Sequence, residues 1–172
     1  MVKKNRVPKT EQAMDRAFLN CQTRKKFRDV EKSQFSDYLL RAQKDLSSAE
    51  RDFKAEDFHW ARVKGYQALF YLLNALLVKH LGYFSKDHGC VIVALMKNEI
   101  ITEETAGKIN LLAERTLKHA NSRIIYDDID EFRIQRNFAL YKPKAWEDVK
   151  KEDVKAELDK IKQNFKILVS LL

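Results

Sequence analysis

Glycine and proline are scarce in this chain: its 172 residues include only four glycines and two prolines. Tight hairpin turns and the loops of β-sandwiches depend on these residues, so the shortage argues against an all-β fold. Hydrophobic residues make up 45% of the chain and charged residues 34%, which is typical of a helical globule with a charged surface and not of a disordered chain. The length suits one well-buried domain.

Cysteine is equally scarce. Cys21 and Cys90 are the two cysteines, and neither lies in a CxxC or CxxH segment of the kind typical of zinc sites and redox pairs. We therefore expect free thiols, as in a reducing cytoplasm. The basic first residues are not followed by the apolar segment of a signal peptide, which adds to the expectation of a cytoplasmic protein.

Sequence motifs for catalysis and cofactor binding are also missing. There is no GxSxG segment, and the glycines are isolated, so no glycine-rich phosphate loop is expected. The histidines lack the spacing that places two rings on one helix face, so we expect no metal site and no cofactor. They are His59, His80, His88 and His119. His80 and His88 flank a turn and could converge, but a structural or surface role is the simpler interpretation.

The stretch from Trp60 to Gly82 predicts a central helix. Its apolar residues recur at three- and four-residue steps and also fill the flanks, so the helix is apolar nearly all round and should be buried. Gly82 suits the position that ends it. The apolar run is shorter than the ~20 residues that span a bilayer, so we expect no membrane span. Polar residues also interrupt it: Lys64, Gln67, Asn74, Lys79 and His80.

Apolar stripes and capping residues predict the other helices. They run from Thr10 to about Asn20, from Ser33 or Ser36 to about Ala55, from His88 to Lys97 after the cap Asp87, onward from Thr102, from Asp127 to Tyr141 before Pro143, and from Lys151 to the end. No alternating strand pattern competes with them, so the predicted fold class is all-α.

The positive charge of the chain is concentrated near its start. The formal net charge is +8, and residues 1–32 hold ten Lys and Arg against four acids. Such a segment can attract phosphate backbones non-specifically. The plainer alternative is a solvated lead-in with no binding role.

One polar segment, R-N-F-A-L-Y, has a composition suited to binding phosphate. Arg136 supplies a planar fork of donors, while Asn137 and Tyr141 are four residues apart and share a strip of the same predicted helix. Together the three side chains could grip a phosphate and neighbouring hydroxyls. A structural arginine beside a half-buried tyrosine is the alternative.

Two stretches resemble the HEPN superfamily of small prokaryotic helical proteins: DYLLRAQKDLSSAERDFKAEDFHWARVKGYQALFYLLNALLVKHLGYFSKDHGC and RNFALY. The shared features are D-L-x-x-A-E in a first helix, a W-A step, a tyrosine-bearing helix rich in Ala and Leu, a G-x-x-S-K-x-H turn, and a late R-x-x-A-x-Y. The last motif resembles a branch that usually has R-x-x-A-D-Y, although Leu140 replaces the aspartate. The matching residues are Asp45, Leu46, Ala49, Glu50, Trp60, Ala61, Gly82, Ser85, Lys86, His88, Arg136, Ala139 and Tyr141.

The resemblance implies a HEPN-like antiparallel bundle of about five helices over residues 33–172. Residues 1–32 would then be a basic N-terminal extension with a short helix. The superfamily is usually homodimeric, with shared polar groups near a cleft, so a homodimer is implied as well.

The resemblance also implies a role in RNA biology. The superfamily includes metal-independent ribonucleases with R-x(4–6)-H, often toxins paired with a nucleotidyltransferase antitoxin. No histidine follows Arg136 here, and Tyr141, with a free pKa of about 10, is a poor base. The leading hypothesis is therefore nucleotide or RNA binding at Arg136, Asn137 and Tyr141, together with a nucleotidyltransferase partner. The alternatives are a ribonuclease in which Arg136 acts with His88 or His119, and a helical dimerisation module without a ligand.

Overall fold

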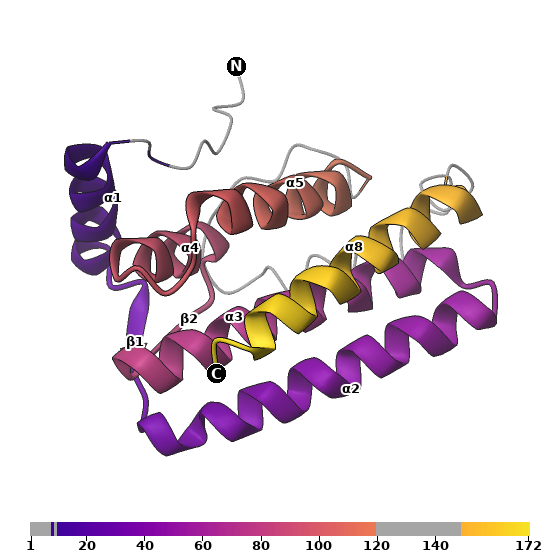
Figure 1. Cartoon of the computed structure of the whole chain (residues 1–172), viewed down its shortest axis with the longest axis horizontal. Helices are drawn as coiled ribbons and strands as arrows, with labels where there is room; N and C mark the ends of the chain where they lie inside the picture. Colours follow the sequence, from indigo (N-terminus) through magenta and orange to yellow (C-terminus); the bar gives the residue numbers. More distant parts are fainter. Residues whose placement is uncertain (1–7, 9, 120–148) are drawn as a thin grey trace.

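Helices form nearly all of the part of the chain that the structure, a computed structural model, describes: residues 8, 10–119 and 149–172. The all-α prediction is confirmed (Figure 1). In order, the elements are α1 (Glu11–Thr23), β1 (Phe27–Asp29), a 3-10 turn η1 (Lys32–Gln34), α2 (Phe35–Lys54), α3 (Phe58–Leu81), β2 (Tyr83–Ser85), α4 (His88–Lys97), α5 (Glu103–His119) and α8 (Lys151–Val169). The helix expected from Asp127 to Tyr141, and Pro143 after it, lie outside the described residues.

The helix α3 is the centre of the fold, as its apolar sequence predicts. Figure 1 shows α2 and α8 running along it, with α4 and α5 on another side. Its fully buried large side chains are Leu69, Leu72, Leu73, Leu76, Leu77 and Val78. Gly65 lets α8 approach closely, because a Cβ atom there would lie 2.9 Å from side-chain carbons of both Leu158 and Ile161. The core is thus built around one helix that has no solvent-exposed face over most of its length.

Side-chain caps fix the ends of several helices. Thr10 accepts a hydrogen bond from the amide of Ala13, and Asp87 accepts one from the amide of Cys90, so two predicted caps are confirmed. Gly82, at φ +71°, ends α3 in the left-handed region, also as predicted. The start of α3 is two residues earlier than expected, because Asp57 caps it.

The prediction that Ser33 or Ser36 opens α2 by capping it is wrong. The residue before the helix is Gln34, which ends the turn η1 and makes no side-chain cap. The Ser36 hydroxyl instead donates to the backbone oxygen of Ser33. The backbone passes from the 3-10 turn directly into the α-helix, so no extended capping residue is needed.

The expectation of no strands needs one correction, because β1 and β2 form a short antiparallel ribbon. Phe27 pairs with Ser85 and Asp29 with Tyr83. Each strand has three residues, too few to show the alternation that marks a strand in a sequence. Through this ribbon the segment after α1 lies against the turn between α3 and α4.

The prediction of free thiols is also wrong. Cys21, in α1, and Cys90, in the first turn of α4, form a disulfide across 69 residues of sequence, with their Cα atoms 5.8 Å apart. The pairing depends on how α1 docks on α4, which cysteine spacing does not reveal. Because disulfides persist mainly in oxidising compartments, the cysteines no longer support a reducing environment.

No helix in the described ranges has the length and apolar character needed to cross a bilayer. The central helix α3, the most apolar long helix, is buried against its neighbours instead. The division of the chain into a 1–32 extension and a 33–172 bundle stays a prediction.

Candidate functional site

The three residues predicted to bind a nucleotide or RNA are not among those that the structure describes. Arg136, Asn137 and Tyr141 all fall between residues 120 and 148. The structure therefore neither brings them together nor separates them. It does describe the turn and the histidine that carry the earlier part of the family motif.

His88 is the first residue of α4, and its imidazole packs against α3. The Tyr66 hydroxyl and His88 Nδ1 lie 3.0 Å apart in a hydrogen bond whose direction depends on the imidazole tautomer. The ring centres of Tyr66 and Phe70 lie 5.6 Å and 6.1 Å from that of the imidazole. The other ring nitrogen, Nε2, is buried. His88 therefore joins α4 to the central helix.

Burial sets the protonation state of His88. It lowers the pKa to about 4, against the opposing effects of a hydrogen bond with Asn110 and the charge of Asp87. The imidazole is therefore neutral at pH 7. A base with so low a pKa accepts a proton poorly in neutral solution, so this arrangement suits a structural link better than general base catalysis.

This burial predicts a loss of stability in mild acid. The folded protein holds His88 neutral, whereas the unfolded chain takes up a proton below its ordinary pKa of about 6.5, so the free energy of unfolding falls as the pH drops from 6.5 toward 4. The full difference is roughly 3–4 kcal/mol. Urea denaturation at several pH values measures it. His88→Gln should lose this part of the pH dependence, and an unchanged dependence in that variant would contradict the assignment.

His80 and His88 do not form the shared site that their positions around a turn allowed. His80 is exposed at the end of α3, and its Nε2 lies 3.1 Å from the backbone oxygen of Leu171. His88 instead meets Tyr66. Within the described ranges no group of three or more His, Cys, Asp or Glu residues is placed to hold a metal ion.

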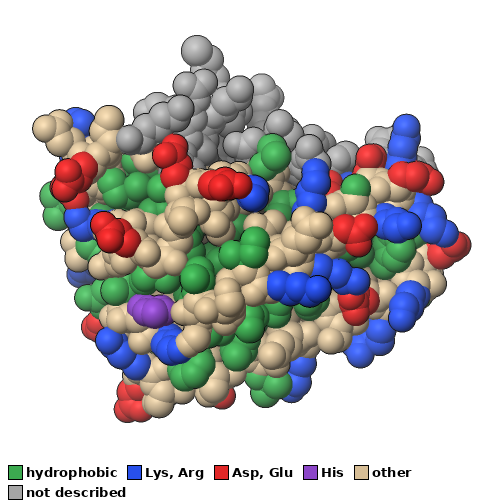
Figure 2. Space-filling model, in the orientation of Figure 1, with side chains coloured by type: hydrophobic (Ala, Val, Ile, Leu, Met, Phe, Trp, Pro, Cys, Tyr) green, Lys and Arg blue, Asp and Glu red, His purple; other side chains and the backbone are tan. Residues whose placement is uncertain are grey.

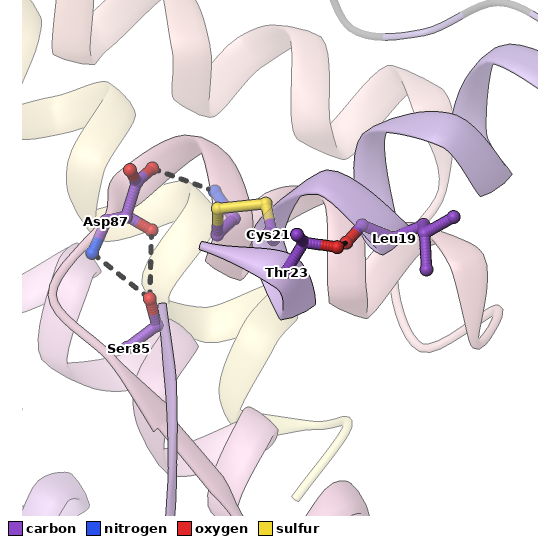
Figure 3. Close-up of a disulfide and its surroundings, with 6 residues drawn as sticks. Leu19, Cys21, Thr23, Ser85 and Asp87 are labelled. Carbon is purple, nitrogen blue, oxygen red and sulfur yellow. Dashed lines mark hydrogen bonds between the residues drawn. A yellow bond between two sulfur atoms is a disulfide. The ribbon is translucent and has the colours of Figure 1, made fainter. Parts of the chain in front are cut away.

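A polar network holds the turn that positions His88. The buried Asn74 accepts a hydrogen bond from the Ser85 amide at 3.0 Å and donates one to the Phe70 carbonyl at 3.2 Å. The Ser85 hydroxyl bonds the backbone of Asp87, whose carboxylate caps α4 at Cys90 (Figure 3). The serine of the G-x-x-S-K-x-H turn is therefore buried and structural, since it fixes the start of α4.

A buried ion pair joins α3 to α8 and was missed from the sequence. Arg62 Nε donates to Glu157 Oε2 at 2.6 Å and Arg62 Nη2 to Glu157 Oε1 at 3.3 Å. The side chains are 3% and 8% exposed. The signal was present: Arg62 stands within a nearly all-apolar helix, and Glu157 stands within the apolar stripe of α8 beside Val154 and Leu158.

The comparisons with known proteins give one match. The model of the HEPN domain family matches residues 35–168, which is most of the chain. No curated protein and no solved structure matches the sequence. The matched range begins at the first residue of α2 and ends one residue before the last residue of α8.

Proposed function

Because this chain belongs to the HEPN family, we propose that it binds RNA or a nucleotide through Arg136, Asn137 and Tyr141. The observation that carries the proposal is that the family match includes the segment R-N-F-A-L-Y. A guanidinium suits the geometry of a phosphate, and the amide and phenol beside it can bond neighbouring hydroxyls. The net charge of +8 favours anionic ligands.

We further propose that the protein is a homodimer and acts with a nucleotidyltransferase-type partner in a toxin–antitoxin-like system. The likeness of its motifs to the R-x-x-A-D-Y branch supports this. Copurification of the protein with the product of an adjacent nucleotidyltransferase gene is the direct test. A protein that stays monomeric and binds no such partner at micromolar concentration would contradict it.

Binding without cleavage agrees better with the residues present than ribonuclease activity does. The arginine and histidine of R-x(4–6)-H act together on the RNA, and no histidine follows Arg136. In the ribonuclease alternative, His88 or His119 would replace the missing histidine of that motif. His88, however, is neutral, buried and bonded to Tyr66. Incubation of the pure protein with RNA distinguishes these alternatives, since RNA degraded by the protein but left intact by Arg136→Ala would support the enzyme.

Replacing Arg136 with alanine is expected to weaken the binding of a short RNA about 10- to 100-fold. Charge-assisted hydrogen bonds to phosphate contribute roughly 1.5–3 kcal/mol, and alanine removes them all. Fluorescence anisotropy at fixed salt measures the dissociation constant. Arg133→Ala is the matched control, because it removes the same charge from the same segment. Equal losses in both variants would indicate a general charge effect instead of a site.

The third possibility, a helical dimerisation module without a ligand, makes an opposite prediction. A ligand raises the melting temperature only if it binds the folded state better than the unfolded one. A dimerisation module would therefore show no shift with any nucleotide or RNA. We expect a shift that depends on Arg136.

A further inference from the structure

The α2–α3 hairpin and β2 carry a group of aromatic and cationic side chains that the proposed site does not use. Tyr38 and Phe84 lie with their ring centres 5.4 Å apart and their planes 30° apart. Arg41 Cζ lies 5.5 Å from the centre of the Tyr71 ring. None of the four side chains is fully buried. We call these four residues the aromatic platform.

A buried acid orients the cation of the platform. Asp45 is 3% exposed and accepts a hydrogen bond from Arg41 Nε at 3.0 Å, while Lys64 Nζ lies 3.8 Å from its other oxygen. The Arg41 side chain is nevertheless 50% exposed. Its two terminal nitrogens have no hydrogen-bond partner among the described residues. The guanidinium is thus held in place by its inner nitrogen and keeps its two outer amino groups for a ligand.

Two cations and two acids surround the platform, so attraction for a phosphate depends on the exposed Arg41 guanidinium itself. The negative charge of Asp45 is shared by two cations, Arg41 and Lys64, and Asp37 is the exposed acid beside Tyr38. Burial is the largest cause that raises the pKa of both Tyr38 and Tyr71 above 10, so both phenols stay protonated at neutral pH and do not repel phosphate.

The face drawn in Figure 2 differs from the platform, because cationic and acidic side chains are interspersed over α8 and α2. There Lys162 pairs with Glu50 at 2.5 Å and Lys151 with Glu56 at 3.2 Å. These cations are paired with neighbouring acids, and Lys151 also lies 5.9 Å from the centre of the Phe58 ring, which packs against Phe53. The front face therefore provides control positions for a test of the platform.

We propose that the aromatic platform is a docking surface for single-stranded RNA, in which unpaired bases stack on the Tyr38–Phe84 pair while Arg41, held over Tyr71, binds a phosphate. Stacking on aromatic rings combined with nearby cations is how proteins hold single strands without reading their sequence. A duplex hides its base faces and would not use the rings. The inference rests on the proposed RNA binding and adds a surface far in sequence from Arg136.

Anisotropy with a labelled oligoadenylate and with an RNA duplex of the same length tests the proposal. We expect Tyr38→Leu to weaken oligoadenylate binding about tenfold and leave duplex binding unchanged, because it removes a stacking surface. Arg41→Gln should weaken single-strand binding and lower the slope of log affinity against log salt by about 0.7, the value for one phosphate contact. Lys166→Gln removes an exposed charge from α8 and should change neither. Melting temperatures confirm that each variant folds.

The same assay separates this inference from the proposed function. If Arg136→Ala abolishes binding while Tyr38→Leu and Arg41→Gln bind like the wild type, the platform is overturned and the site at Arg136 stands. If only the platform variants lose affinity, the platform stands and the site at Arg136 fails. Platform variants that dissociate a dimer in light scattering but keep their RNA affinity assign the surface to a protein contact, which also overturns the proposal.

Discussion

Replacing Glu157 with leucine is expected to lower the free energy of unfolding by about 3–5 kcal/mol, because it leaves the charge of Arg62 buried without its carboxylate. Arg62 already has one terminal nitrogen, Nη1, without a hydrogen-bond partner among the described residues. Removing Glu157 would leave the other two donating nitrogens, Nε and Nη2, without their acceptor as well. The denaturant midpoint of the variant, compared with the wild type, gives the change.

Two further variants show whether the loss comes from the unpaired charge or from the altered packing. The double variant Arg62→Met with Glu157→Leu removes both charges and keeps side chains of similar size, so we expect most of the stability to return. Glu104→Gln breaks an exposed pair with Lys108 and should leave the denaturant midpoint almost unchanged, because solvent screens that pair. A double variant as unstable as the single one would mean that shape, not charge, accounts for the loss.

The helices could be predicted because their signals are local. Apolar period and capping residues lie within a few positions of the elements they specify, so Thr10, Asp87 and Gly82 are found at the ends where the sequence predicts them. The central place of α3 follows from composition alone, since a helix apolar on all sides has to be covered on all sides. The prediction of a capping serine at the start of α2 failed, because backbone geometry and not a side-chain cap determines where this helix begins.

The contacts between distant parts of the chain could not be predicted in the same way. Arg62 and Glu157 are 95 positions apart, and Tyr66 and His88 are 22 apart. Each pair is in contact only because two helices pack together, and a single sequence does not show which distant residues will be in contact. The candidate residues Arg136, Asn137 and Tyr141 rest on motif order and on the family match, and their geometry stays a prediction.

The disulfide contradicts the sequence-based prediction of free thiols more clearly than any other contact. Its removal is expected to have the second large effect on stability. Closing a loop of 69 residues corresponds to about 4 kcal/mol in the chain-entropy estimate, and measured values for such bonds are typically 2–4 kcal/mol. Chemical denaturation with and without a reductant measures the effect. The double variant Cys21→Ser with Cys90→Ser should match the reduced protein and should not respond to reductant.

Removing the disulfide should reduce the local stability of α1 first, because the bond attaches this helix to α4. Other contacts of that helix remain after reduction: Lys97 pairs with Asp15 and lies over the Phe18 ring, whose centre is 5.5 Å from that of Phe27. These contacts lie at the surface or are half-buried, and exposed pairs contribute less than about 1 kcal/mol. In contrast, α3 keeps its covering by α2 and α8. Hydrogen exchange should therefore rise in α1 before it rises in α3. Equal protection of both helices after reduction would show that α1 docks without the bond, and thiol titration of the unfolded, unreduced protein would then test whether the bond forms.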